Sequence, residues 1–283
     1  MTYELVIVGA GISGLSAALT AHEAGLENVL ILDYEKQRGG FASPLFGSEA
    51  FAEERRLTER AARLPYDVFY KTSVTGFFPG EDGGNHQLLV QTPEGAKTVE
   101  ASRVLLCSGS LEKPREGNWI AGSRPAGVMT PVMAIQLLKR GYVPGERVLV
   151  MDTGRLSRAA AELLEKAGLA VERLSGDLWE VHQVEGLARL SAVQVRERAA
   201  GRWKTVECDT LVFSRQRIPC TFYLKGSPVE RDERQAIRVD ESGRTNIAGV
   251  YAAGTCTDRG DDEHLGSIEA GRHAMNTILH ERG

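Results

Sequence analysis

The sequence has few cysteines and no cluster of metal-binding residues. Only four cysteines occur among 283 residues, at positions 107, 208, 220 and 256. No two of them form a CxxC pair, and no histidine cluster stands beside them at the spacing of metal ligands. These absences argue against a disulfide framework and a structural metal site. The sequence therefore predicts a reducing, cytoplasmic setting and no bound metal.

The sequence also lacks long apolar runs and any strong excess of charge of one sign. No stretch approaches the roughly 20 consecutive apolar residues of a membrane helix. The net charge is -4, and lysine and arginine are scattered rather than grouped into a basic stripe. We therefore expect neither a membrane nor a nucleic acid as a partner. The length and a hydrophobic content of 42% suffice for two compact domains.

A glycine motif stands near the start of the chain, where residues 9–14 read GAGISG. In such a motif Gly9 permits a sharp bend and Gly11 lets the backbone approach a pyrophosphate. Gly14 lets the following helix pack closely on the preceding strand. The start of that helix presents N–H groups and a partial positive charge to phosphates. The motif is thus typical of a dinucleotide site.

The surroundings of the motif support this interpretation. An apolar run at 4–8 predicts a strand before the glycines, and residues 15–24 predict a helix after them. A second strand at 29–32 ends at Asp33, where a carboxylate suits ribose hydroxyls. This order favours a dinucleotide site over the alternative, a glycine-rich turn with a surface aspartate.

The rest of the chain repeats the same strand and helix pattern. A small antiparallel insert is expected from β-like runs at 71–78, 87–92, 97–101 and 104–107. A second cycle follows, with helices at 132–140 and 156–167, strands at 147–151 and 171–174, and further strands at 180–184, 191–198, 204–207 and 211–214. A short strand at 237–239 and a helix at 267–280 return to the first domain. The sequence predicts an α/β fold of two Rossmann-like domains, with the second (113–236) inserted in the first (1–112 and 237–283).

Four segments in this order carry a family resemblance: GAGISG, LILDYEKQRGG, VLLCSGS and TNIAGVYAAGT. The chain resembles the FAD domain of the pyridine nucleotide-disulfide oxidoreductase superfamily, whose fold is that of glutathione and thioredoxin reductases. The stretches SRPAGVMTP and GYVPGERVLVM resemble a subgroup without the redox CxxC, found beside glycerol-3-phosphate and opine dehydrogenase subunits. The resemblance implies an FAD-binding first domain and a second domain of the NAD(P)-binding type.

The resemblance also implies a set of residues that bind FAD. They comprise the glycine turn, the acidic residue and the GG pair after it, the turn that closes over the flavin, and the late motif with the helix that follows. The expected cofactor-binding residues are Gly9, Gly11, Ile12, Ser13, Gly14, Asp33, Tyr34, Gly39, Gly40, Val74, Cys107, Ser108, Gly109, Gly254, Thr255, Ser267 and Ile268.

Three motifs depart from the family pattern. The late motif of the family ends in Gly-Asp, whereas Gly254 is followed here by Thr255. The second dinucleotide motif reads MDTGRLS and places Asp152 and Ser157 where the family has glycines. Gln216 stands where a glycine usually follows the strand at 211–214. Because two of these departures fall in the second domain, we expect NADH and NADPH to bind poorly.

Two further groups of residues leave alternatives open. Cys107 and Cys256 both follow strands aimed at the flavin, and they form either a redox pair or ordinary small packing residues. His264 is either a proton donor to substrate or flavin or part of a solvated acidic loop, which is the favoured alternative. The acidic residues of that loop are Asp261, Asp262 and Glu263. No catalytic residue is assigned, because no nucleophile elbow or Ser-His-Asp order occurs.

These patterns together predict an FAD-dependent oxidoreductase. We expect the flavin subunit of a small-molecule dehydrogenase, or an electron-transfer partner to one, without a redox dithiol. The alternatives are an NAD(P)H-dependent flavoprotein reductase and a noncatalytic FAD-binding scaffold or regulatory subunit. The expected partners are a small-molecule substrate or a redox partner protein, and both a homodimer and a hetero-oligomer are compatible with the sequence.

Overall fold

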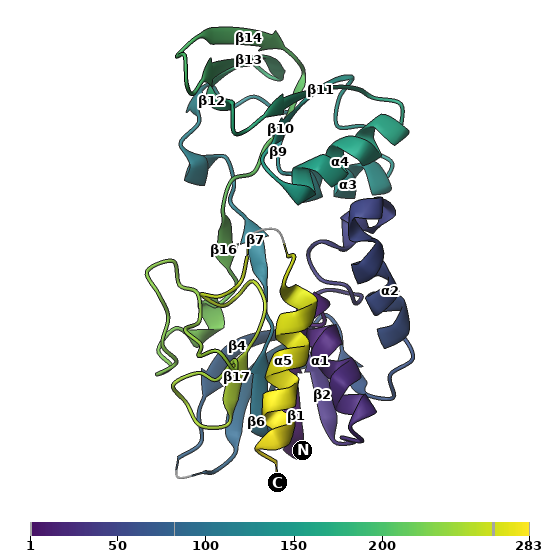
Figure 1. Ribbon diagram of the computed structural model, residues 1–283, viewed down its shortest axis with the longest axis vertical. Helices are drawn as coiled ribbons and strands as arrows, with labels where there is room; N and C mark the ends of the chain where they lie inside the picture. The colour runs from purple at the N-terminus through teal and green to yellow at the C-terminus, as the bar shows by residue number, and fades with distance from the viewer. Residues whose placement is uncertain (1, 82, 262–263, 283) are drawn as a thin grey trace. The chain divides into compact units, whose positions relative to one another are not determined.

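A computed structural model of the chain describes residues 2–81, 83–261 and 264–282 (Figure 1). The chain forms two compact units. Unit 1 comprises Met1–Ser43, Glu53–Leu111 and Ile218–Gly283, and unit 2 comprises Pro44–Ala52 and Glu112–Arg217. Each unit contains a parallel sheet with a strand–turn–helix–strand motif, and unit 2 is inserted in unit 1. The predicted fold class, with two Rossmann-like domains, is confirmed.

Unit 1 is built on one sheet whose strands follow the order β3-β2-β1-β6-β5-β4, with β17 also paired to β6. β1, β2, β3 and β17 all run parallel to their neighbours, which is the arrangement of a dinucleotide fold. The strands are β1 (Thr2–Val8), β2 (Val29–Leu32), β3 (Asp67–Phe69), β4 (Ser73–Phe78), β5 (His86–Thr92), β6 (Gly95–Leu106) and β17 (Val250–Ala252).

One long strand replaces the two predicted runs at 97–101 and 104–107. β6 extends from Gly95 to Leu106, and its first half pairs antiparallel with β5. Its second half pairs in parallel with β17, while its other edge pairs in parallel with β1. The expected insert is therefore not a separate sheet, because the β4–β5 hairpin extends the main sheet through β6. Ile237, expected in a strand at 237–239, takes part only in isolated bridges.

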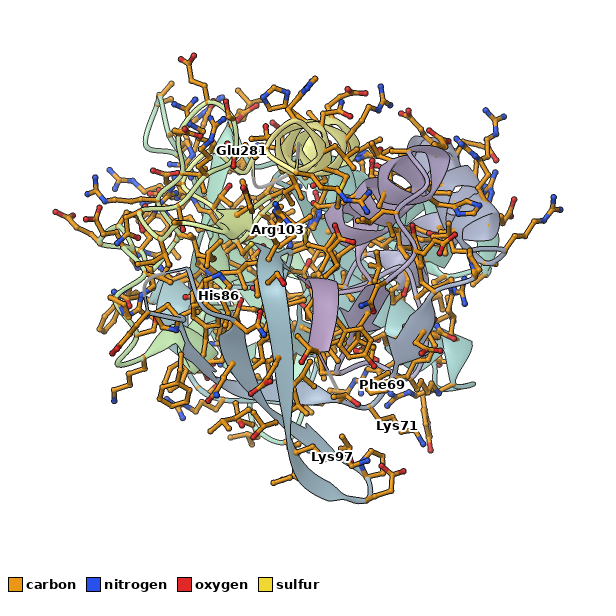
Figure 2. All side chains as sticks on the ribbon, turned by 90° about the horizontal axis from the view of Figure 1, so that it is seen from below. Phe69, Lys71, His86, Lys97, Arg103 and Glu281 are labelled. Carbon is orange, nitrogen blue, oxygen red and sulfur yellow. The ribbon has the colours of Figure 1, made fainter. Side chains whose placement is uncertain are left out.

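The helices α1 (Ile12–Glu23) and α5 (Ser267–His280) pack side by side in unit 1 (Figure 1). The side chain of Ser16 in α1 donates to the carbonyl oxygen of Ile268 in α5 at 2.7 Å. At the other end of α5, Arg103 of β6 donates to the carbonyl oxygen of Glu281 at 3.2 Å (Figure 2). The last helix is thus fixed to the first helix and to the sheet at its two ends.

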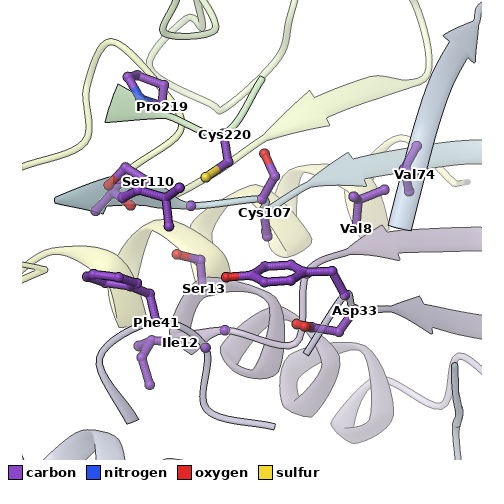
Figure 3. Close-up of a pocket in the computed structure, with 18 of the residues that line it drawn as sticks. Val8, Ile12, Ser13, Asp33, Phe41, Val74, Cys107, Ser110, Pro219 and Cys220 are labelled. Carbon is purple, nitrogen blue, oxygen red and sulfur yellow. The ribbon is translucent and has the colours of Figure 1, made fainter. Parts of the chain in front are cut away.

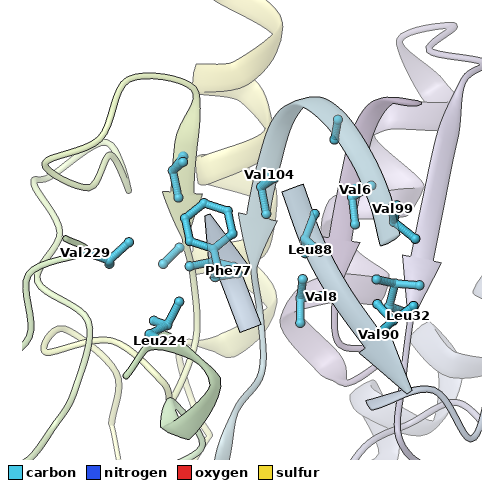
Figure 4. Close-up of a cluster of buried hydrophobic side chains, with 14 of the residues drawn as sticks. Val6, Val8, Leu32, Phe77, Leu88, Val90, Val99, Val104, Leu224 and Val229 are labelled. Atoms are coloured by element: carbon cyan, nitrogen blue, oxygen red, sulfur yellow. The ribbon is translucent and has the colours of Figure 1, made fainter. Parts of the chain in front are cut away.

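The buried core of unit 1 includes residues that the sequence analysis assigned to the second domain. Strand residues such as Val6 and Leu88 pack with Leu224 and Val229 in one buried cluster (Figure 4). The predicted boundary at 236 therefore differs from the structure, where unit 2 ends at Arg217. Residues 218–236 return to unit 1 because their apolar side chains complete its core. A helix α2 (Ala52–Ala61) and the 3-10 turn η4 (Phe222–Leu224) are not among the predicted elements.

Unit 2 contains a parallel sheet and a second sheet of short strands. The parallel sheet has the order β11-β10-β15-β9, and the other sheet has the order β14-β13-β12-β8. A buried cluster that includes Leu149, Val193 and Leu211 joins strands of both sheets. The elements are β8 (Ala121–Gly122), β9 (Val128–Met129), α3 (Pro131–Lys139), β10 (Arg147–Asp152), α4 (Arg155–Lys166), β11 (Ala170–Ser175), β12 (Trp179–Gly186), β13 (Leu190–Glu197), β14 (Trp203–Glu207) and β15 (Thr210–Val212).

Shorter elements complete the chain. β7 (Ser110–Glu112) and β16 (Arg217–Pro219) pair with each other where the chain passes between the units. The 3-10 turns are η1 (Ser43–Gly47), η2 (Glu49–Phe51) and η3 (Glu116–Asn118). Within the described ranges, none of the helices has the length and apolar character needed to span a bilayer. Over the same ranges, no group of three or more acidic, histidine or cysteine residues is arranged to hold a metal ion.

Candidate functional site

The carboxyl ends of parallel strands meet at one edge of unit 1 and form a pocket of about 380 Å³. Most of the predicted cofactor-binding residues line it, because they follow these strands or begin a helix there, whereas Val74 lies in β4. The lining includes Gly9, Gly11, Ile12, Ser13, Asp33, Tyr34, Gly39, Gly40, Val74, Cys107, Ser108, Gly109, Thr255 and Ser267. Figure 3 shows Asp33 and Val74 toward one end of the pocket and Phe41, Ser110 and Pro219 toward the other.

Three predicted residues do not line the pocket but support its walls. A Cβ at Gly14 would stand 1.9 Å from the carbonyl oxygen of Gly9, so this position permits close packing of α1 on β1. A Cβ at Gly254 would stand 2.0 Å from the Oγ of Ser13. Ile268 is buried, and its carbonyl oxygen accepts the hydroxyl of Ser16. The structure thus places these three residues behind the pocket lining, where they pack against its walls.

The glycines at the pocket floor make room for a ligand close to the backbone. Gly9 has φ +114, and a Cβ there would meet the carbonyl oxygen of Cys107 at 2.2 Å. Gly40 has φ +67, and a Cβ there would meet the Cα of Gly11 at 2.7 Å. A Cβ at Gly11 itself would have no neighbour closer than 3.8 Å. Gly11 thus leaves open space beside the first turn of α1, where N–H groups have no partner within the helix.

Asp33 ties the glycine turn to the end of β2. One carboxylate oxygen accepts the N–H of Ala10 at 2.5 Å, and the other accepts the N–H of Glu35 at 2.7 Å. Burial raises the pKa of the Asp33 carboxyl above its ordinary value, although these two hydrogen bonds act in the opposite direction. Each oxygen keeps a second lone pair, so the carboxylate can still accept ribose hydroxyls. The alternative of a satisfied surface aspartate is wrong, because Asp33 is buried and lines the pocket.

Hydroxyl groups stand where the two helices begin. Ser13 at the start of α1, Ser267 at the start of α5 and Thr255 beside them are all buried and line the pocket. Their hydroxyls make no hydrogen bond with any residue in the described ranges. Two helix N-termini and three free hydroxyl donors suit a pyrophosphate without any cationic side chain. Thr255 thereby replaces the aspartate of the family with a neutral donor.

The cysteines of unit 1 are free and largely buried. Cys107 and Cys220 line the pocket, while the Sγ of Cys256 lies 3.5 Å from the carbonyl oxygen of Leu106. Burial raises the pKa of Cys107 and Cys256, and it raises the pKa of Cys220 to about 11. Because the thiolate is the reactive form, neutral thiols support the packing interpretation over a redox pair.

His264 belongs to the pocket rather than to a solvated loop. Its side chain is 8% exposed and lines the pocket, and its backbone has φ 61. The carboxylate of Asp261 accepts the N–H groups of Leu265 and Gly266, both at 2.9 Å, which shapes the entry to α5. The favoured interpretation of a solvated acidic loop is therefore wrong for His264. Asp262 and Glu263 lie outside the described residues.

Several pocket residues were not predicted. They come from the last residues of β1 and β2, from the segment after the GG pair, from the residues after β3, and from the strand pair β7 and β16 with the residues that follow them. They are Val8, Leu32, Phe41, Ala42, Thr72, Ser73, Ser110, Leu111, Ile218, Pro219, Cys220, Phe222 and Tyr223. Adjacency to a predicted residue was the one available signal, and it applies to Val8, Leu32, Phe41, Ser73 and Ser110. The others reach the pocket through tertiary contacts, such as the bond from the Tyr223 hydroxyl to Ser108 at 3.2 Å.

In the corresponding turn of unit 2, the side chain of Ser157 forms hydrogen bonds with the backbone of the turn. The Oγ of Ser157 accepts the N–H groups of Thr153 and Gly154 at 3.0 and 3.1 Å. The same hydroxyl donates to the carbonyl oxygen of Gly154 at 2.8 Å. Asp152 forms an ion pair with Arg158 at 3.5 Å. Two N–H groups of this turn, those of Thr153 and Gly154, are thus already hydrogen-bonded.

Arg155, the first residue of α4, is also engaged within unit 2. Its guanidinium donates to the carbonyl oxygen of Ala50 and lies 4.1 Å from the centre of the Phe51 ring. Nearby, Ser48 donates to Glu162 of α4 at 2.5 Å. Gln216 keeps a left-handed backbone, with φ 67, at the position where the family has glycine. The segment Pro44–Ala52 therefore contacts α4 both at its first residue, Arg155, and at Glu162.

Comparison with known proteins places the chain in a family. Residues 126–277 match the family described as pyridine nucleotide-disulphide oxidoreductase, and residues 4–47 match the FAD binding domain. The chain belongs to the pyridine nucleotide-disulphide oxidoreductase family. The predicted resemblance and the predicted cofactor are confirmed, and the chain is an FAD-dependent oxidoreductase.

Individual relatives differ in length from this member of the family. The chain is 26% identical to a thioredoxin reductase of Treponema pallidum, over 89% of this chain and 88% of the relative. It is 29% identical to the sarcosine oxidase subunit alpha of Rhizobium meliloti, but it spans only 28% of that subunit. The solved structure of an L-proline dehydrogenase from P. horikoshii matches all of this chain and 56% of that chain, with a TM-score of 0.76 at 21% identity. This last likeness shows the shared fold.

Proposed function

We propose that unit 1 holds FAD along the pocket, with the adenosine ribose at Asp33 and the flavin ring toward Phe41, Ser110 and Pro219. The observation that carries the proposal is that strand ends far apart in sequence bring the predicted ligand residues into one pocket. The bare backbone at Gly11 and the hydroxyls at two helix starts suit the pyrophosphate between these ends. When bound, FAD supplies hydride and electron transfer, and the residues named here bind and orient it.

We further propose that electrons pass directly between the flavin and a substrate or partner, without a dithiol. The sequence has no CxxC, and burial raises the pKa of each cysteine that lines the pocket. Neutral, buried thiols are poor nucleophiles for disulfide exchange. His264 is the imidazole at the pocket wall, which supports it as the group that exchanges a proton with the substrate.

The turn of unit 2 supports the proposal that NADH and NADPH are not the electron source. Its amides are bonded to Ser157, and Asp152 adds a negative charge where a phosphate would approach. Arg155, which would otherwise attract a phosphate, is held by Ala50 and Phe51. The alternative of an NAD(P)H-dependent reductase therefore has less support than a flavin subunit supplied by another electron source.

A partner subunit is the proposed source of substrate. The matched sarcosine oxidase chain is by name the alpha subunit of a larger enzyme, and this chain spans 28% of its length. We propose that this chain serves in the same way as the flavin-carrying part of a small-molecule dehydrogenase or of its electron-transfer chain. A homodimer remains the alternative assembly.

The test is the absorbance spectrum and flavin content of the purified protein, followed by titration with FAD and FMN. We expect a flavin spectrum, release of FAD on denaturation, and clear preference for FAD, because FMN has neither the adenosine ribose nor the pyrophosphate that Asp33 and Gly11 would bind. Equal affinity for FAD and FMN would contradict the proposed site. A folded protein that binds neither flavin would favour the noncatalytic scaffold.

A further inference from the structure

The side chain of Thr255 opens into the pocket of unit 1. The residue is 9% exposed, and it lines this pocket together with Ser13 and Ser267. Its Oγ1 forms no hydrogen bond with any residue in the described ranges, yet it is not enclosed by protein, whereas the Oγ of Ser110 is enclosed. The Thr255 hydroxyl is therefore accessible to a ligand that occupies the pocket.

Two turns hold this hydroxyl in place. Gly254, with φ +83, bends the chain after β17, and its carbonyl oxygen accepts both the N–H and the hydroxyl of Thr257, at 3.0 and 2.8 Å. A Cβ added at Gly109, in the turn after β6, would stand 3.8 Å from the Oγ1 of Thr255. The hydroxyl thus lies where the ends of two neighbouring parallel strands meet.

The pocket around Thr255 carries little charge. Among the described residues that line it, Asp33 is the only carboxylate, and no lysine or arginine is present. Figure 3 shows Asp33 at the end of the pocket away from Phe41 and Pro219. The carboxylate of Asp261 binds backbone N–H groups at the entry to α5, and Asp261 is not part of the lining. A carboxylate at position 255, as in the late motif of the family, would therefore add a negative charge to a nearly uncharged region.

We propose that Thr255 raises the reduction potential of bound FAD, because it places a neutral hydroxyl where the family has a carboxylate. This inference rests on the proposed placement of FAD along the pocket. Reduction of a flavin by two electrons with uptake of one proton adds one negative charge to its ring. A carboxylate in the same largely buried pocket repels this charge, whereas a hydroxyl does not.

A higher potential fits the direction of electron flow in the proposed function. It allows the flavin to accept electrons from a C–H bond of substrates that are weaker reductants than NADH, such as amines. It also agrees with the turn of unit 2, where the Ser157 hydroxyl binds the N–H groups of Thr153 and Gly154. Both features suit a flavin that is reduced by a substrate rather than by NADH.

The experiment compares wild type with Thr255→Asp and with Thr255→Asn, which has the shape of the Asp variant without its charge. The control Thr98→Asp adds the same charge at an exposed residue of β6. The dissociation constants of oxidised and reduced FAD are measured for each protein at about pH 8, where an aspartate is ionised. Because the ratio of these constants sets the midpoint potential, a variant that binds FAD weakly still gives a result.

We expect Thr255→Asp to weaken binding of reduced FAD about tenfold more than binding of oxidised FAD. This ratio lowers the midpoint potential by about 30 mV for a two-electron couple. Thr255→Asn and Thr98→Asp should stay within about twofold of wild type in the same ratio, which is about 9 mV.

The Asn variant and thermal unfolding of the flavin-free proteins separate this role from a structural one. The Asp variant should fold, because the family carries aspartate at this position. A structural role would lower the Tm and weaken both redox forms of FAD equally, in the Asn variant as much as in the Asp variant. A wild-type potential in Thr255→Asp, or an equal shift in Thr255→Asn, would overturn the inference. Failure of wild type itself to bind FAD would instead overturn the proposed function.

Discussion

The two strand–turn–helix units of this chain place different groups at equivalent positions of their turns. Gly9, Gly11 and Gly14 of unit 1 correspond to Asp152, Gly154 and Ser157 of unit 2. At Gly14 even a Cβ would stand 1.9 Å from the carbonyl oxygen of Gly9, so the helix packs tightly, and residues at its start line the pocket. At Ser157 the side chain fits, and its Oγ binds the N–H groups of the turn.

The difference shows that a duplicated fold does not duplicate a binding site. Both turns join a parallel strand to a helix, and both helices offer the partial positive charge of an N-terminus. In unit 2 the Ser157 hydroxyl binds the N–H groups of Thr153 and Gly154, whereas the Gly11 that corresponds to Gly154 has no such side chain beside it in unit 1. Binding therefore depends on whether the amides of the turn are left unbonded by their own side chains, and not on the turn alone.

The largest expected effect is a loss of FAD affinity when a side chain is placed in the turn of unit 1. Gly11→Val should lower FAD affinity at least about 100-fold, which corresponds to about 2.7 kcal/mol, because the side chain fills the space beside the phosphate-binding amides. The fold should persist, since a Cβ at Gly11 has no neighbour closer than 3.8 Å. Flavin fluorescence titration measures binding, and circular dichroism measures folding.

Gly14→Ala is the matched control for this prediction. Its Cβ would meet the carbonyl oxygen of Gly9 at 1.9 Å, so this variant should lose stability of the fold itself. If Gly11→Val bound FAD as tightly as wild type, the turn would not be the phosphate site.

The next prediction concerns a gain in NADH affinity when the side chains that occupy the turn of unit 2 are removed. The double variant Asp152→Gly with Ser157→Gly should gain about tenfold or more in NADH affinity, because it removes a like charge and frees the amides of Thr153 and Gly154. Asp152→Gly alone should gain less, since Ser157 still binds these amides. Anaerobic titration with NADH and NADPH measures both variants. Rapid bleaching of wild-type flavin at micromolar nucleotide would show that the turn is open already.

A smaller effect concerns the N-terminus of α3 in unit 2, where Glu112 accepts the N–H of Val132 at 3.2 Å. Burial raises the pKa of Glu112 above 4.5, so the folded protein keeps this proton at pH values where the unfolded chain has lost it. Its contribution to stability therefore falls as pH rises from 4.5 through the raised pKa. A tenfold difference in proton affinity between the folded and unfolded states corresponds to about 1.4 kcal/mol.

Glu112→Gln should remove this dependence and make the variant more stable than wild type above that pH range. Urea unfolding at a series of pH values provides the measurement, with the exposed Glu116→Gln as a control. A variant whose stability relative to wild type does not change with pH would refute the raised pKa of Glu112.

The smallest expected effect concerns the thiol of the pocket wall. Cys220→Ser should change the rate of flavin reduction by less than about twofold, because burial raises the pKa of Cys220 to about 11 and keeps it a neutral thiol. Stopped-flow reduction of the FAD form measures the rate. Loss of reduction, or of a charge-transfer absorbance, would restore a thiol mechanism.

The sequence alone determined the parts of the fold and site that are local. The turn at 9–14, Asp33 and the turn at 107–109 each follow a strand directly, and Thr255 comes shortly after β17. Because parallel strands place their carboxyl ends at one edge of a sheet, reading these motifs was enough to predict that they meet. The altered glycine positions of unit 2 were equally visible, although what Ser157 does there was not.

Tertiary structure decided what depends on residues distant in sequence. Leu224 and Val229 assign residues 218–236 to unit 1 because they are buried against its strands, and no local periodicity marks that contact. Cys220 and Tyr223 reach the pocket of unit 1 only through folding, because no predicted motif adjoins them in the sequence. His264 likewise lies in a sequence that resembles a solvated loop, yet its side chain is buried at the pocket. Burial and the choice of hydrogen-bond partner are properties of the packed chain, so the sequence pattern could not supply them.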